Sequence, residues 1–391
     1  MKKIFTLAAA GALATASLTA QAQITLDGVV NANEIGSAAA GQYVSLGAYN
    51  QPHPSGFGDW GLLRMYAANT STKLYFFLAG TPENNGNGFH LYMDFPHLNR
   101  VPDATPLPTI TGTDPAAPTM FEVKGTEPGV AGMVLDMPVD AALALKGDGA
   151  NFIPQALMFT SATAGTATNL TPTIPTAAGA PQTINASATT GAFAPLAGMR
   201  MAFRTTSTGK VTDNPGAAVP NPGGAGSYGW EIEMDRAALG LPAGANVIRL
   251  FAGYVANSGY WSSDVIPEIP GNTTNLENTP DFSLEQGTQA ATFNVVVTSS
   301  RQAAEAAVAM GVFPNPSADK TTITYQVLGK SQAVQVVLTD LMGRTVRTLH
   351  NGTESAGFHN LEVSKQDVSA GTYLVKVQVG DKAATRKVVL L

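Results

Sequence analysis

Polar and apolar residues alternate along several short stretches of this chain, and such a period of two residues predicts β-strands. Residues 322–328 place Ile323, Tyr325 and Val327 on one face, and residues 334–338 repeat the pattern. Glycine-containing pairs separate these stretches, and glycine favours the tight reversal of a β-hairpin. The C-terminal part therefore predicts about seven short strands in a small sandwich of immunoglobulin-like type.

The longer N-terminal part contains further strand patterns. Residues 73–79 form a strongly apolar run, and residues 89–95 put apolar side chains on one face and His90, Tyr92 and Asp94 on the other. Additional strands are expected at 62–68, 152–159, 199–203, 228–234 and 247–254.

Composition agrees with a chain built from strands and turns. Only 13% of the 391 residues are charged, while 40 glycines and 25 prolines supply many turns and few helix-forming positions. This balance predicts an all-β protein with long Pro-, Gly- and Thr-rich loops. The length exceeds what a single hydrophobic core usually supports, so at least two domains are expected.

Charge also divides the chain in two. Residues 23–310 carry 11 Lys and Arg against 22 Asp and Glu, a net charge of −11, whereas residues 311–391 carry 9 against 6, a net charge of +3. Nucleic acids and anionic membrane surfaces reward clustered cations, so the acidic segment argues against both as partners.

The N-terminus has the pattern of a secretory signal peptide. The chain begins Met-Lys-Lys, continues with an apolar, Ala-rich run at 4–18, and offers Ala-Gln-Ala at 20–22, which predicts cleavage before Gln23. The apolar run is too short for a stable membrane span, so no transmembrane segment is expected after residues 1–22 are removed. The absence of cysteine excludes a lipoprotein anchor, disulfides and thiolate metal sites.

The sequence therefore predicts four consecutive segments. The signal peptide precedes a β-sandwich passenger domain at 23–298, in which 100–225 is expected to form loop-rich insertions rather than a second core. A polar, Ala-rich stretch at 299–310 predicts an exposed linker, and a second domain follows at 311–391.

The last domain begins with Pro-Asn-Pro and has Gly-x-Tyr near its end, in that order. It resembles the C-terminal sorting domain (type A) of proteins exported by the type IX secretion system of Bacteroidetes. The positions that carry this resemblance are Pro314, Asn315, Pro316, Gly343, Gly371, Tyr373, Gly380 and Lys387.

The resemblance implies a route and partners. It implies export through the periplasm to the outer cell surface or the medium, with the type IX secretion machinery and its processing protease as partners. In such proteins the linker, here 299–310, is where the protease removes the sorting domain.

The passenger carries a second set of motifs. An apolar-Asp-Gly opening lies at 24–28, a Leu-Tyr pair at 74–75, an aromatic-Glu-x-Glu-apolar segment at 230–234, and a Leu-Gly pair at 239–240. This order is similar to the DOMON-like sandwich superfamily, which includes family 9 carbohydrate-binding modules. The resemblance implies a sandwich fold, and a carbohydrate-binding role is expected from it.

Aromatic residues in loops are the candidate ligand-binding positions. Sugar rings stack on Trp and Tyr, and nearby carboxylates accept hydrogen bonds from the sugar hydroxyl groups. Asp59 and Trp60 precede one strand, and Tyr260, Trp261 and Asp264 occupy a loop after another. For both tryptophans the alternative is packing in the core. The third tryptophan lies within an alternating strand and is expected in the core.

The sequence specifies no cofactor. His90, Asp94 and His97, with His53 upstream, lie close enough in sequence to suggest zinc, but nothing fixes a full set of convergent ligands. They are expected to be surface polar residues.

Calcium is a further option. Asp27 with Glu34, or the loop at 80–88, offers oxygen ligands, but no ordered Asp-x-Asp spacing supports such a site.

Catalytic motifs are also missing. A literal Gly-x-Gly-x-x-Gly at 224–229 lacks the preceding strand and following helix of a dinucleotide site and is expected to be a turn. Glu231 and Glu233 lie two apart on one strand face and are expected to point to solvent.

Three functions remain open. The passenger is expected to be a non-catalytic binding module for carbohydrate or another extracellular ligand. Alternatives are a structural or adhesive surface protein without a small-molecule site, and a glycan-active hydrolase with an unfamiliar site.

Overall fold

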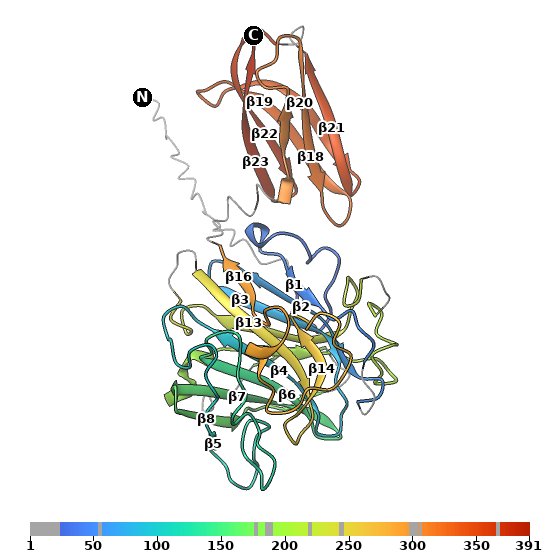
Figure 1. Ribbon diagram of the computed structural model, residues 1–391. Coiled ribbons are helices and arrows are strands. Elements are labelled where there is room, and N and C mark those ends of the chain that lie inside the picture. The colour runs from blue at the N-terminus through green and yellow to red at the C-terminus, as the bar shows by residue number, and fades with distance from the viewer. Residues whose placement is uncertain are drawn as a thin grey trace, which may run out of the picture.

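The computed structural model describes residues 24–53, 57–175, 179–183, 191–217, 221–241, 246–296, 304, 307–364 and 368–391. The expected signal peptide and most of the expected linker therefore lie outside the described residues. Strands make up nearly all regular structure in the described part, which confirms the all-β class (Figure 1). Short 3₁₀ helices occur at η1 (Ala38–Ala40), η3 (Gly191–Leu196) and η4 (Phe282–Leu284).

One sheet of the passenger is antiparallel and runs in the order β1-β2-β3-β12-β11-β10. It joins the beginning of the passenger to residues far along the chain, because β3 pairs with β12 in the middle of the sheet. Its strands are β1 (Val44–Ala48), β2 (Gly61–Asn69), β3 (Lys73–Thr81), β10 (Gln182–Thr183), β11 (Arg200–Phe203) and β12 (Gly229–Asp235).

The second sheet of the passenger is larger and runs in the order β15-β14-β13-β4-β6-β7-β8-β5, with β16 pairing β13 and β9 pairing β7. The main strands are β4 (Gly88–Asp94), β6 (Ala141–Gly147), β7 (Asn151–Ser161), β8 (Ala164–Asn169), β13 (Asn246–Val255) and β14 (Tyr260–Ile266). The short ones are β5 (Thr111–Gly112), β9 (Ile174–Pro175), β15 (Glu277–Asn278) and β16 (Ala291–Val295).

The main core lies between these two sheets. Phe76 and Ile232 enter it from the smaller sheet, and Leu91, Leu143 and Leu250 enter it from the larger one. The predicted apolar face of β4 is therefore confirmed. The tryptophan expected in the core, Trp230, has no exposed surface.

Both sheets are also covered on their outer faces. Residues of 101–139 pack with Phe282 on the outside of the larger sheet and form a second core, which includes Phe121 and Met133. A smaller cluster, which includes Tyr43 and Phe77, covers the outside of the smaller sheet. Side chains on both faces of the central strands are consequently buried, as the unbroken burial of β4 illustrates.

This arrangement corrects the expectation for residues 100–225. Five strands of the larger sheet, β5 to β9, come from this segment, and residues 101–139 supply much of the second core. Alanine, methionine and proline break the simple alternation here, because strands buried on both faces do not need it.

The C-terminal domain has the seven strands expected, among the described residues, arranged as two sheets around one core. One sheet has the order β17-β18-β21 and the other β20-β19-β22-β23. The strands are β17 (Gly311–Phe313), β18 (Lys320–Val327), β19 (Gln332–Thr339), β20 (Thr345–Glu354), β21 (Gly357–Ser364), β22 (Gly371–Val379) and β23 (Lys382–Leu390).

The boundary of this domain differs from the expected one. Val308 is 1% exposed and Met310 is 6% exposed, and both belong to the core of the C-terminal domain. The last residues of the expected linker are thus part of the folded domain rather than exposed.

Candidate functional site

The predicted ligand-binding residues line neither of the two pockets described below, which involve only described residues. Trp261 is 1% exposed and packs against Phe251 and Phe282 in the second core, with ring centroids 5.9 and 5.6 Å away. Of the two roles expected for Trp261, ligand stacking and core packing, the structure supports core packing, because its ring is enclosed by other aromatic rings. Asp264 is also buried, since its side chain has no exposed surface.

The other three predicted residues are more accessible. Trp60 and Tyr260 are half-buried and pack on the main core. Asp59 faces elsewhere: its carboxylate accepts hydrogen bonds from the amide and hydroxyl of Thr212 at 3.0 and 2.5 Å. Asp59 therefore fixes a surface loop, and its side chain does not join the others.

Asp264 has a partner that the sequence did not reveal. His53 Nδ1 lies 2.6 Å from Asp264 Oδ2, and the Leu62 amide donates to the same oxygen at 3.2 Å. Burial opposes protonation of His53, but the hydrogen bond and charge of Asp264 outweigh it and raise the pKa of His53. Burial in turn raises the pKa of Asp264. This contact ties the loop before β2 to β14.

A more open arrangement lies on the outer face of the smaller sheet. Because side chains alternate along a strand, β12 directs Glu231 and Glu233 to this face, and β11 directs Arg200 there. Arg200 is paired in register with Glu233, and Ala202 with Glu231. The expectation that both glutamates point to solvent is wrong, because Glu231 is 0% and Glu233 is 7% exposed.

Glu231 holds the beginning of the passenger on the sheet. Its Oε2 accepts hydrogen bonds from the Asp27 and Gly28 amides, each at 2.9 Å, and its Oε1 accepts one from the Tyr43 hydroxyl at 2.7 Å. The Asp-Gly and Glu-x-Glu motifs, far apart in sequence, thus meet in space. Burial raises the pKa of Glu231 to about 8, against the lowering effect of these three donors.

A pocket of about 400 Å³ opens beside Glu231. Its walls are the segment 24–27 and the loop 179–181, and its charged lining consists of Asp27, Arg200, Arg204 and Glu233. We call it the β11–β12 pocket. The wall is closely packed, since a side chain at Gly179 would collide with the carbonyl oxygen of Asp27.

The charges in the β11–β12 pocket are partly paired. Arg200 Nη1 lies 3.4 Å from Glu233 Oε2, and Lys73 Nζ lies 3.6 Å from Glu233 Oε1. Arg204 instead lies over the ring of Tyr228, with its guanidinium carbon 4.6 Å from the ring centroid. Sequence reasoning missed Arg200 and Arg204, because nothing in the chain's periodicity says that they share a face with a motif 30 residues away.

Metal-binding arrangements are not found in the part of the chain that the structure describes: no three His, Asp or Glu side chains converge there. His90, expected at the surface, is instead buried, and burial lowers its pKa to about 3. Glu34, offered as a calcium ligand, accepts hydrogen bonds from the Thr25 and Asn31 amides at 2.7 and 2.8 Å. In the loop at 80–88, Asn84 Oδ1 accepts from the amides of Asp148 and Gly149.

The C-terminal domain is closed along one side by its first residues. The Asn315 side chain donates to the Lys387 carbonyl at 2.7 Å and accepts from the Val389 amide at 2.9 Å. The Ser317 amide donates to the Val389 carbonyl at 2.9 Å. The Pro-Asn-Pro motif and the residue after it therefore cover the outer edge of β23.

The other positions of the predicted sorting signal have structural roles as well. Gly343 and Gly380 adopt φ values of +80° and +57° in turns, a conformation that favours glycine. The Tyr373 hydroxyl donates to the Ser369 carbonyl at 2.8 Å and so fixes the approach to β22.

Comparison with known families assigns this domain. Residues 311–391 match the family described as "Secretion system C-terminal sorting domain". Residues 311–391 are a type IX sorting domain. The protein is therefore sorted by the type IX secretion system to the cell surface or the extracellular space. In the described part of the chain, no helix has the length and apolar character required to cross a membrane.

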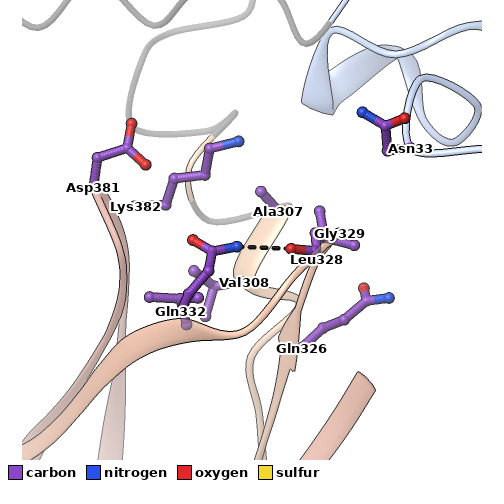
Figure 2. Close-up of a pocket in the computed structure, with 10 residues that line it drawn as sticks. Asn33, Ala307, Val308, Gln326, Leu328, Gly329, Gln332, Asp381 and Lys382 are labelled. Atoms are coloured by element: carbon purple, nitrogen blue, oxygen red, sulfur yellow. Dashed lines mark hydrogen bonds between the residues drawn. The ribbon is translucent and has the colours of Figure 1, made fainter. Parts of the chain in front are cut away.

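The sorting domain also has a pocket of about 250 Å³ at its linker-facing end. Val308, Gln326, Leu328 and Gln332 line it, and the Gln332 side chain donates to the Leu328 carbonyl at 2.7 Å (Figure 2). Among the lining residues only Asn33 comes from the passenger. The pocket thus lies where the chain enters the sorting domain.

Two solved structures match this chain with low structural similarity. Dimeric latent PorU from Porphyromonas gingivalis is 13% identical, with a TM-score of 0.20, over 89% of this chain and 34% of that one. The BSP domain of a biofilm-associated protein is 8% identical, with a TM-score of 0.17, over 92% of this chain and 54% of that one. The chain thus spans about a third and about half of these structures. None of the curated proteins compared matches the chain.

Proposed function

We propose that the passenger is a non-catalytic binding module for an extracellular glycan, and that the β11–β12 pocket is its ligand site. The observation that carries this proposal is the open, charged lining of that pocket beside a rigidly held N-terminal segment. The resemblance of the passenger's motifs to DOMON-like and family 9 carbohydrate-binding modules supports the same function.

The lining has the chemistry that a sugar needs. Carboxylates of Asp27 and Glu233 accept hydrogen bonds from hydroxyl groups, and the guanidinium groups of Arg200 and Arg204 donate to hydroxyl and ring oxygens. Specificity in such sites comes from a few fixed polar groups. Glu231 fixes the wall by binding two of its amides.

A non-catalytic role fits the arrangement of acids. A glycosidase needs two carboxyl groups across a cleft, one of them free to protonate the leaving group. In this pocket Glu233 is paired with Arg200 and Lys73, and the Asp27 side chain accepts from the Val29 amide at 3.0 Å. We propose that the module needs no cofactor.

The proposed route completes the function. A signal peptide at 1–22 takes the chain to the periplasm, the sorting domain takes it across the outer membrane, and a protease of the secretion system cleaves in the linker. This itinerary and the Bacteroidetes origin follow from the resemblance of the sorting domain, and the released or surface-held passenger then meets its glycan.

The test is a glycan array followed by calorimetry with the full chain. The variant Ala180→Trp fills the β11–β12 pocket from its loop wall, where Ala180 is exposed. We expect it to abolish binding, while Ala150→Trp, at an exposed turn of the other sheet, and Trp60→Ala leave binding intact. If Trp60→Ala abolished binding and Ala180→Trp did not, the ligand would bind at the sheet edge and not in the β11–β12 pocket. No binding to any glycan by the folded wild-type protein would overturn the proposal.

A further inference from the structure

Arg204 differs from every other charged group in the β11–β12 pocket. Arg200 and Glu233 bind each other, and Lys73 adds a second cation to Glu233. Arg204 is exposed, and in the described part of the chain its guanidinium makes no hydrogen bond or ion pair. It is nevertheless positioned, because it lies on the ring of Tyr228, and stacking on an aromatic face leaves the edge donors of a guanidinium free.

Cationic and acidic side chains are balanced around the pocket. Lys73, Arg200 and Arg204 lie there with Asp27, Glu233 and Asp235, whereas residues 23–310 as a whole hold 11 cationic side chains against 22 acidic ones. Burial raises the pKa of Glu231 to about 8, so this carboxyl group adds little negative charge at neutral pH. Burial raises the pKa of Asp27 and the charge of Arg204 acts against that rise, so these two side chains attract each other. In the described part of the chain no hydrogen bond joins them, and the edge donors of Arg204 stay available to a ligand.

The two arginines occupy different ends of the pocket. Arg200 begins β11 and Arg204 follows its last residue, so their α-carbons lie roughly 13 Å apart along an extended chain. At one end of the pocket, Arg204 offers donors to an acidic group of a ligand. At the other end, Arg200 and Glu233 offer a donor and an acceptor to neutral hydroxyl groups.

We propose that the β11–β12 pocket selects acidic sugars, with the carboxylate of a uronic acid residue bound edge-on by Arg204 and the hydroxyls of the neighbouring sugar bound by Arg200 and Glu233. The planar fork of arginine matches a carboxylate with two parallel hydrogen bonds. This assignment names the ligand class of the proposed binding module and rests on that function.

The experiment compares one ligand with and without its charge. Calorimetry on the full chain uses uronic acid oligosaccharides and the same oligosaccharides after carboxyl reduction. We expect the acidic ligand to bind about 10- to 100-fold more tightly, because a charge-assisted bidentate contact is lost on reduction. Arg204→Gln should remove this preference, because it weakens binding of the acidic ligand far more than binding of the reduced one, and the two affinities should then be similar.

Two variants serve as controls. Lys210→Gln removes one exposed charge outside the pocket and should preserve the preference, which separates a specific contact from general attraction. Arg200→Gln should weaken both ligands, because it disturbs the hydroxyl-binding end. Arg204 is exposed, so its replacement is expected to leave the thermal unfolding temperature unchanged.

The outcomes separate this inference from the proposed function. Equal affinity for the acidic and reduced ligands, both lost with Ala180→Trp, would overturn acidic selection and keep the glycan module. Polyglutamate that competes as well as the uronic acid ligand would overturn the sugar assignment, because the carboxylate would then come from an acidic peptide. Failure of all glycans to bind would overturn both.

Discussion

Gly61 shows how a single position can hold the predicted residue Asp264 in place. A β-carbon at Gly61 would come within 3.0 Å of Asp264 Oδ2 and His53 Nδ1. Only a residue without a side chain permits the His53–Asp264 contact, whose carboxylate has no exposed surface.

We predict that Gly61→Ala destabilises the passenger by about 1–3 kcal/mol, the usual cost of overpacking. The free energy of unfolding from guanidinium titration measures this loss. Gly371→Ala, where the nearest atoms lie 3.3 Å away on the side chain of Tyr373, is the comparison. A Gly61→Ala protein as stable as wild type would contradict the close packing around Asp264.

The raised pKa of Glu231 makes the stability of the passenger depend on pH. Its pKa in the folded protein is about 8, raised from 4.5 by burial. The folded state therefore holds this proton more tightly than the unfolded chain. The resulting stability is complete below about pH 4.5 and is lost as the pH rises through about 8.

The matching variant is Glu231→Gln, which cannot ionise. We expect the free energy of unfolding of the wild type to fall more steeply with rising pH across this window than that of Glu231→Gln. Chemical denaturation of both proteins at several pH values measures the difference. Parallel profiles would mean that Glu231 ionises normally in the fold.

At the residue scale, the sequence drew attention to Asp264, Glu231 and Glu233 but did not reveal which residues contact them. His53 follows an irregular loop and Arg204 follows a four-residue strand, so no periodicity connects either to its site. Their roles depend on strand pairings across more than 30 residues.

At the element scale, the notable feature is that both sheets of the passenger are covered on both faces. The loop 101–139 packs on the larger sheet and encloses Phe159 and Trp261 in the second core. Alternation along a strand distinguishes two faces but does not say whether the second face meets water or another layer. For this reason the sequence predicted most strands of the passenger and misjudged residues 100–225.

Phe159→Ala tests whether this second layer contributes to the fold. Phe159 is 1% exposed, so we expect a loss of about 3–5 kcal/mol, the cost of removing a buried phenylalanine. Phe76→Ala, in the main core, should cost a similar amount. Urea unfolding of both variants provides the comparison. A loss of under about 1 kcal/mol for Phe159→Ala, a third of the smallest loss expected, would mean that residues 100–170 behave as a dispensable insertion.

At the scale of the whole molecule, the passenger and the sorting domain have separate cores. No hydrophobic cluster among the described residues contains side chains from both. The two should therefore unfold independently, as the proposed cleavage in the linker would require.

Val308→Asp should lower the thermal unfolding temperature of the sorting domain only. It places an unpaired charge in that domain's core, where Val308 is 1% exposed. Ala309→Asp, one residue further and exposed, is the control and should have little effect. Calorimetry that resolves the two transitions gives the answer. A shift of the passenger transition by Val308→Asp would mean that the two domains share a core.

The sequence by itself determined the all-β class, the seven strands of the last domain and the sorting signal, because these rest on local alternation, turn glycines and motifs read along the chain. Only the tertiary structure decided that residues 101–139 build a second layer, that β6, β7 and β8 join the larger sheet, that Trp261 is buried, and that Glu231 binds Asp27 and Gly28. It also placed Arg200 and Arg204 beside Glu233. These features arise when distant strands pair and cover one another, and no local pattern encodes which distant segment will do so.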